Sequence, residues 1–128
     1  MPPAAEFVAG PSCSAFLPAT DAGCERVAVR FRALSEPTRL KIVRRLALGE
    51  ACVGEIVAAV GGTQANVSKH LGVLRASDLV ARTRRGPRTV YRLADPALLR
   101  MCSIVCEGVE RGARERAAAV LGPATGPP

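Results

Sequence analysis

The sequence predicts a mainly α-helical fold with one small β-hairpin, and three observations support this fold class. Apolar residues recur at helical spacing through most of residues 21–76. Residues 79–93 are rich in β-branched residues and arginine and are interrupted by Gly86-Pro87, a pair typical of turns. A second helical pattern of roughly 25 residues begins after Asp95-Pro96. The predicted order is α-α-α-α-β-β-α in one domain, residues 20–121.

The segments at either end of this domain lack periodicity. Residues 1–19 and 122–128 are rich in Pro, Gly and Ala, and we expect both to be mobile tails.

The first two helices are expected over residues 21–34 and from Ser35 to about residue 48. The first carries an apolar stripe of Cys24, Val27, Phe31 and Leu34. Ser35 is expected to cap the second helix, with Pro37 in its first turn, where a missing N–H costs nothing. Gly49 should end this helix. Its buried stripe is predicted to be Leu40, Val43, Leu46 and Ala47.

The next two helices are short and separated by Gly61-Gly62, a strong break. The third helix, residues 52–60, is predicted to bury Cys52, Ile56 and Ala59. The fourth, residues 63–76, is expected to be capped by Thr63 and to bury Val67, Leu71 and Leu74, which lie within about 60° of one another. Its opposite face carries small or short polar residues that permit close approach to another molecule: Ala65, Asn66, Ser68, Lys69 and Gly72.

The positive charge of the chain is concentrated in one segment. The whole chain has a formal net charge of +7, and residues 63–94 hold most of it, with seven Lys and Arg against Asp78 alone. Such a concentration points to a polyanionic partner.

Two short helices joined through a Gly turn and followed by a basic hairpin form a winged helix-turn-helix. In this arrangement the second helix enters the major groove of double-stranded DNA, and the hairpin reaches phosphates or the minor groove. The alternative, an amphipathic helix beside a solvated basic face, is disfavoured because the two features adjoin. The predicted DNA-binding residues are Thr63, Gln64, Asn66, Ser68, Lys69, His70, Arg84, Arg85 and Arg88.

These residues have different expected roles. Gln64 and Asn66 suit adenine edges, Lys69 suits guanine or a phosphate, and Ser68 suits either. The three arginines should supply salt-sensitive affinity that is independent of sequence. For His70, the only histidine, a half-buried position and a structural or DNA-proximal role are favoured over metal binding, since no second imidazole is present.

Three segments resemble the ArsR/SmtB family of metal- and metalloid-responsive repressors: ALSEPTRLKIVRRL, GEACVGEI and TQANVSKHLGVLRASDLVARTRRGPRTVYRL. The resemblance covers about residues 24–111. It implies a homodimer that holds a palindromic operator and releases it when an inducer binds. It also implies a dimer interface formed by the first and last helices, which carry Phe31 and the apolar stripe between Leu98 and Val109. An apolar last helix suits an interface independently of the resemblance.

The candidate metal ligands are cysteines. Cys52 stands where many family members place a metal-binding thiolate, and Cys102 and Cys106 are spaced i, i+4, about 6 Å apart on one helix face. Cys13 and Cys24 are further candidates. A site made of thiolates alone favours As(III), Sb(III), Cd(II), Pb(II) or Hg(II). We expect one such ion per protomer to act as the inducer. For each of these cysteines, the alternative is a structural role as a small apolar residue of the core.

Two other site types of the family are not expected. The zinc-sensing branch of the family binds zinc with Asp and His residues of its last helix. This chain has the matching residue at the first of these positions, Asp95, but non-ligand residues at the others, Ala97, Gly108 and Arg111. The cysteine pair of the persulfide-sensing branch would fall at Arg44 and Glu110. A redox or persulfide switch at Cys102 and Cys106 nevertheless stays open. A thiol enzyme is disfavoured, because the chain lacks a CxxC motif and a base histidine beside a nucleophile.

The cellular location is expected to be cytoplasmic. The first residues lack the basic region of a secretory signal, and no window approaches the roughly 18 apolar residues of a membrane span. Five cysteines form no disulfide framework.

Overall fold

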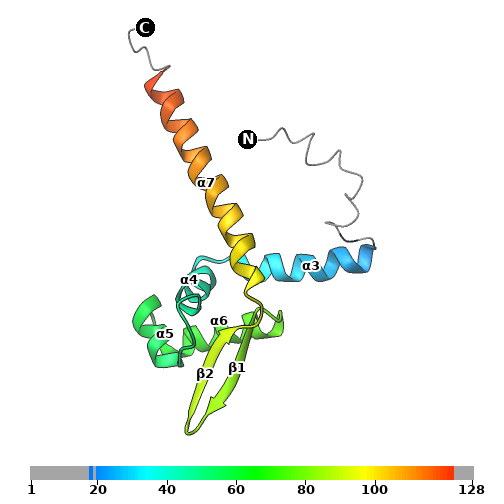
Figure 1. The fold of residues 1–128 in the computed structure, drawn as a ribbon, viewed down its shortest axis with the longest axis vertical. Coiled ribbons are helices and arrows are strands. Elements are labelled where there is room, and N and C mark those ends of the chain that lie inside the picture. The colour runs from blue at the N-terminus through cyan, green and yellow to red at the C-terminus, as the bar shows by residue number, and fades with distance from the viewer. Residues whose placement is uncertain (1–17, 19, 123–128) are drawn as a thin grey trace. The chain divides into compact units, whose positions relative to one another are not determined.

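The computed structural model describes Pro18 and residues 20–122. Within these residues it contains five helices and one antiparallel hairpin (Figure 1), in the order α3 (Asp21–Leu34), α4 (Pro37–Leu46), α5 (Val53–Val60), α6 (Gln64–Ala76), β1 (Val80–Arg85), β2 (Arg88–Leu93) and α7 (Ala97–Leu121). The predicted element order is confirmed, and the fold is a winged helix-turn-helix. The predicted tails fall almost entirely outside the described residues. The chain divides into two compact units, one ending at Ala94 and one beginning at Asp95.

The junction between α3 and α4 corrects one predicted helix cap. Ser35 closes α3, and its hydroxyl donates to the carbonyl oxygen of Arg32 at 2.8 Å. Glu36 caps α4 instead, because its Oε2 accepts from the backbone N–H of Arg39 at 3.0 Å. The reason is that Pro37 occupies the first helical position, so that the capping position falls on the residue immediately before it.

The boundaries of α5 and α6 match the prediction closely. Gly61 and Gly62 have φ of +87° and +83°, left-handed values that glycine adopts without strain, and they separate the two helices. The Oγ1 atom of Thr63 accepts from the backbone N–H of Asn66 at 3.1 Å and caps α6. The predicted buried stripe of α6 is also confirmed, since all its members are 0% exposed: Val67, Leu71 and Leu74.

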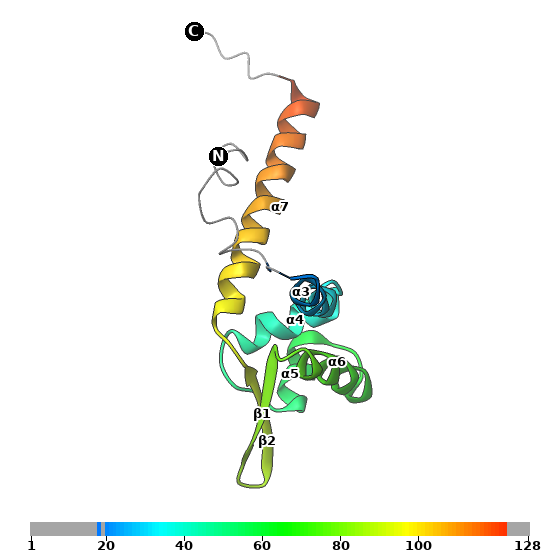
Figure 2. The ribbon, with the colours of Figure 1, turned by 90° about the vertical axis from the view of Figure 1, so that its right-hand side faces the viewer.

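The hairpin falls within the predicted residues, with Gly86-Pro87 between its strands, and it has a third, unpredicted partner. Its register runs from Val80 opposite Leu93 to Arg85 opposite Arg88, and Figure 2 shows that it projects beyond the helices of its unit. On the other edge of β2, Ala51 and Tyr91 exchange two backbone hydrogen bonds of 3.1 and 2.8 Å. These two bonds hold the segment before α5 against the β1–β2 hairpin, which is the wing of this fold.

In the core of the first unit, the buried face of α4 differs from the one that helical periodicity alone predicts. Leu40, expected to be buried, is 45% exposed, whereas Ile42 is fully buried. Ala47 and Ala59 are exposed as well. Two faces of α4 carry apolar residues at helical spacing, and only packing against α5 and α6 selects the one that carries Ile42, Val43 and Leu46.

The apolar stripes predicted on the first and last helices are largely exposed in the single chain. On α3, Leu34 is buried, but Cys24 is exposed, and Val27 and Phe31 are 40% and 54% exposed. On α7, Leu98 is buried, Met101 and Cys102 are half-buried, and three further residues are exposed by 59–69%: Ile104, Val105 and Val109.

Among the described helices, none has both the length and the apolar character required to cross a membrane.

Candidate nucleic-acid interface

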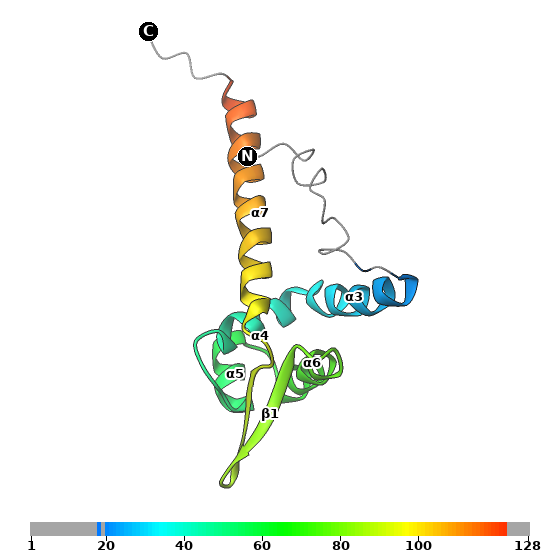
Figure 3. The same cartoon turned by 45° about the vertical axis from the view of Figure 1, so that its right-hand side comes forward.

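One side of α6 is open to solvent and carries the predicted base-reading residues. The helix packs its apolar side against α4, α5 and β1, and Figure 3 shows it beside the base of the hairpin. The opposite side is therefore exposed, and two of its residues, Ala65 and Gly72, are small. Thr63 is exposed too, although its Oγ1 is engaged in capping the helix. The remaining predicted readers are all exposed: Gln64, Asn66, Ser68 and Lys69.

Two of the three predicted wing arginines are engaged by carboxylates. Arg85 binds Glu50 through two contacts, Nη2 to Oε1 at 2.8 Å and Nε to Oε2 at 3.3 Å. Arg88 donates from Nη2 to Oε1 of Glu55 at 2.7 Å. Arg84 is exposed and forms no ion pair with any described residue. The hydrogen bond from Arg85 lowers the pKa of Glu50 and, in return, raises the pKa of Arg85.

Sequence reasoning missed both acidic partners, which lie more than 30 residues from the arginines in the chain. The contacts depend on the Ala51–Tyr91 bridge, which places the residues on either side of Ala51 next to β2. A single backbone bridge leaves too short a pattern in the sequence to be recognised as a strand.

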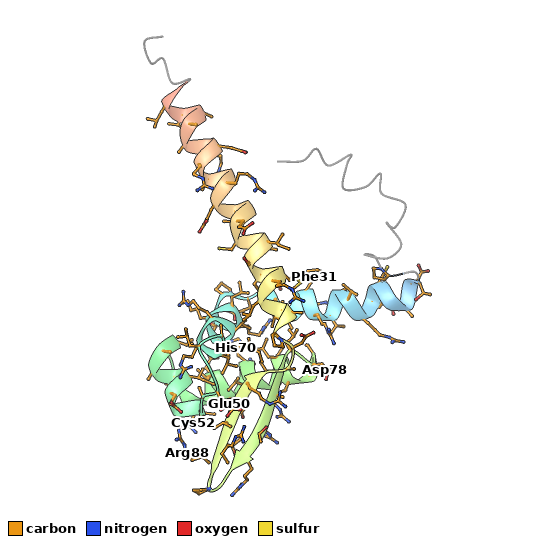
Figure 4. All side chains as sticks on the ribbon, in the orientation of Figure 1. Phe31, Glu50, Cys52, His70, Asp78 and Arg88 are labelled. Atoms are coloured by element: carbon orange, nitrogen blue, oxygen red, sulfur yellow. The ribbon has the colours of Figure 1, made fainter. Side chains whose placement is uncertain are left out.

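Cys52 belongs to a polar cluster at the start of α5 rather than to an apolar stripe. Its Sγ lies 3.1 Å from Nη2 of Arg88, and its backbone N–H donates to Oε1 of Glu55 at 3.1 Å (Figure 4). The Cys52 side chain and backbone N–H lower the pKa of Glu55, as do the nearby guanidinium groups of Arg88 and Arg45. The cluster joins the thiol to the wing through one arginine.

His70 lies on the inner side of α6 and faces α4. Its side chain is 14% exposed, and its Nδ1 is 3.2 Å from Nη1 of Arg39 and 3.7 Å from Oε2 of Glu36. The half-buried position expected for His70 is observed. Burial acts to raise the pKa of Glu36, but the backbone N–H groups of Thr38 and Arg39, together with the nearby imidazole, lower it overall.

The other described thiols lie on α3 and α7. Cys24 on α3 and Cys106 on α7 are exposed, Cys102 is half-buried, and all the described cysteines are free thiols. Burial raises the pKa of the Cys102 thiol, which disfavours its thiolate form. Cys106 has its Sγ 3.8 Å from Oε1 of Glu110. Cys13 lies outside the described residues.

The thiol donors fit a soft ion only in part. Nowhere in residues 20–122 do three or more His, Cys, Asp or Glu side chains gather closely enough to hold a metal ion. Cys102 and Cys106 offer two sulfur donors one helical turn apart on α7. A complete coordination sphere would need ligands in addition to these two thiols.

Comparison with known proteins agrees with this architecture. Residues 36–82 match the family profile described as "Bacterial regulatory protein, arsR family". The chain is 36% identical over 85 residues to the biofilm growth-associated repressor of Agrobacterium fabrum, an alignment that covers 66% of this chain and 73% of the relative. Several mycobacterial regulators are covered over a smaller share of their length, for example 58% and 48%.

Two solved structures are similar over most of their length. The homodimeric winged helix-turn-helix DNA-binding domain of a Mycobacterium bovis protein, described as a possible ArsR-family transcriptional regulator, superposes with a TM-score of 0.69 at 30% identity. This match covers 77% of the present chain and 94% of that domain. The AntR antimony-specific transcriptional repressor superposes with a TM-score of 0.68 at 32% identity, over 82% of this chain and 96% of AntR.

Proposed function

The chain belongs to the ArsR family of bacterial regulatory proteins and is a DNA-binding transcriptional repressor; we propose that it holds a palindromic operator as a homodimer and releases it when cysteine thiolates bind a thiophilic metal or metalloid ion. The cytoplasm, where the operator lies, is its proposed location.

The DNA-binding part of the proposal rests mainly on one observation: α6, with its open face, and the arginine-bearing hairpin belong to the same unit, and the helix contacts the hairpin at β1. Gln64 and Asn66 suit adenine edges in the major groove, and Lys69 suits guanine or a phosphate. Ser68 is short enough for close approach. The arginines of the wing add phosphate contacts that position the protein without reading sequence.

The homodimer is supported by exposed apolar residues on two helices. Phe31 on α3 is 54% exposed, and Val105 and Val109 on α7 are 59% and 64% exposed. Large apolar side chains in such number suit burial against a second copy. The domain from M. bovis is homodimeric. A two-fold symmetric dimer matches a palindromic operator, because each protomer places its reading helix in one half-site.

The inducer is proposed to be As(III), Sb(III), Cd(II), Pb(II) or Hg(II), one ion per protomer, since these ions prefer sulfur ligands. AntR is by name an antimony-specific repressor. Cys102 and Cys106 would offer two thiolates of one helix turn, and Cys52 is the second candidate, with Cys24 and Cys13 as further donors. An ion at Cys52 would have to displace the guanidinium of Arg88.

The test is fluorescence anisotropy with DNA from directly upstream of the chain's own gene, with and without As(III), Cd(II) and Hg(II). We expect at least one of these ions to lower the affinity by about 5–150-fold. If the protein binds the DNA and none of the thiophilic ions weakens binding, the metal-sensing part of the proposal is wrong. Titration of Cys52→Ser and Cys102→Ser, followed by thiolate–metal absorption, identifies the ligands, and Cys24→Ser serves as a comparison.

A second candidate keeps the DNA binding and makes the thiols a redox or persulfide switch. The observation in its favour is that Cys52 is half-buried with its Sγ 3.1 Å from Nη2 of Arg88, in a cluster that also holds the carboxylate of Glu55. A partly exposed thiol of this kind is within reach of oxidants. Mass spectrometry after peroxide or polysulfide treatment separates the two candidates, because metal binding leaves no covalent change.

A further inference from the structure

The side chain of Arg39 joins three helices of the first unit. Its Nε donates to the carbonyl oxygen of Ala33, and its Nη2 lies 3.5 Å from that of Arg32, both in the last turn of α3. Its Nη1 lies 3.2 Å from Nδ1 of His70 on α6, the residue labelled in Figure 4. Arg39 itself belongs to the first turn of α4, where its backbone N–H donates to Glu36.

The bond from Nε satisfies the carbonyl group of Ala33, whereas the carbonyl group of Arg32 also accepts from the hydroxyl and the backbone N–H of Ser35. The last carbonyl groups of a helix have no partner within it, and a guanidinium carries five N–H donors in a fixed fork. One arginine therefore acts as a cap for the end of α3 and, at the same time, as a donor to the half-buried His70. A lysine at this position keeps the charge but cannot make three such contacts in fixed directions.

The linked helices have different tasks under the proposed function. α3 carries Phe31 and the exposed apolar residues expected to meet the second protomer, whereas α6 carries the exposed reading face. In a two-fold dimer on DNA, the two reading helices must be about one helical turn of DNA, roughly 34 Å, apart. Because α3 is expected to lie at the dimer interface, a side chain that holds α6 in place relative to α3 also sets the distance between the two reading helices.

We propose that Arg39 is a positioning residue for operator recognition, which sets the placement of the reading helix α6 relative to α3 through its bonds to Ala33, Arg32 and His70. The inference rests on the proposed dimeric DNA binding. It assigns Arg39 no contact with DNA, because the guanidinium is already engaged by these three partners.

The experiment compares Arg39→Lys and His70→Leu with the unchanged protein. Arg44→Lys is the matched control, since Arg44 is an exposed arginine of the same helix with no ion pair to any described residue. Anisotropy is measured on the duplex from upstream of the chain's own gene and on the same duplex with shuffled sequence, over a range of salt concentrations. Thermal unfolding and sedimentation record the folded fraction and the dimer.

We expect Arg39→Lys and His70→Leu each to weaken binding to the upstream duplex by about tenfold, the scale of losing one base contact when α6 is displaced. Binding to the shuffled duplex and the salt slope should stay unchanged, as should both affinities in Arg44→Lys. The two changes combined should cost less than the product of their single effects, because they break the same contact.

Three results would overturn the inference. A parallel loss on both duplexes with a shallower salt slope would make Arg39 a phosphate contact. A parallel loss with a reduced folded fraction would make its role one of stability alone. Full specific affinity in either variant would remove the link between α3 and α6. If the unchanged protein binds neither duplex, the proposed function itself fails, which is a separate outcome.

Discussion

Arg85 on the wing and Glu50 before α5 form a two-point ion pair, with Nη2 2.8 Å from Oε1 and Nε 3.3 Å from Oε2. Arg88 is held by Glu55 through a single contact, Nη2 to Oε1 at 2.7 Å. Two of the arginines expected to bind phosphate therefore have carboxylate partners in the free protein. Exposed ion pairs of this kind are weak and are screened by salt. DNA phosphates can thus replace the carboxylates, but at some loss of affinity.

Replacement of the carboxylate that holds Arg85 should strengthen DNA binding. Glu50→Gln frees the guanidinium and removes a negative charge from beside the wing. We expect affinity for any duplex to rise by about two- to fivefold, with the larger gain at low salt. Anisotropy titrations at two salt concentrations measure the change.

Glu25→Gln is the control for net charge, since Glu25 is an exposed carboxylate of α3 that makes no ion pair with a described residue. Unaltered or weaker binding by Glu50→Gln would mean that the ion pair holds Arg85 in the geometry that DNA requires.

The salt dependence of binding should distinguish the wing arginines from each other. Arg84→Ala is expected to weaken binding to all sequences and to reduce the slope of log K against log salt by about one, because Arg84 has no ion-pair partner among the described residues to give up. For Arg88→Ala the reduction should be smaller, since Glu55 recovers a counterion when Arg88 moves to a phosphate. A slope that Arg84→Ala leaves unchanged would exclude Arg84 from the phosphate contacts.

Local signals were sufficient for the helices and the reading face. The Thr63 cap, the break at Gly61 and Gly62, and the buried stripe of α6 depend on residues within one or two turns of one another. The contacts around the site were not predictable in this way. Whether α4 buries Leu40 or Ile42 is decided by its neighbours, and the partners of Arg85, Arg88 and Arg39 come from distant elements.

The turn after α6 contains a residue that is strained for its position. Asp78 has φ of +58°, and the backbone N–H of Leu79 donates to the carbonyl oxygen of Leu74 at 3.0 Å, the pattern of a helix end that usually holds glycine. We expect Asp78→Gly to raise the free energy of unfolding by about 0.5–1 kcal/mol, since relief of the left-handed strain exceeds the added flexibility of the unfolded chain. Thermal and denaturant unfolding measure this gain.

Asp78→Asn separates conformation from charge at this position. Asparagine also tolerates the left-handed region, so stability should change less than with glycine. Both variants remove the only acidic residue of segment 63–94 and should therefore bind DNA somewhat more tightly. Equal stability of all three proteins would show that the turn holds no strain.

The exposed phenyl ring of Phe31 offers a direct test of the dimer. Phe31→Ser removes a large apolar side chain that is 54% exposed in the single chain. We expect the dimer dissociation constant to rise by at least about tenfold, as for the central aromatic residue of an interface, with little loss of monomer stability. Val29→Ser is the matched control: Val29 is 43% exposed on the same helix but about 160° away around its axis. Sedimentation over a concentration series measures dissociation. If both variants weaken the dimer equally, or if neither weakens it, the dimer contact lies away from this face of α3.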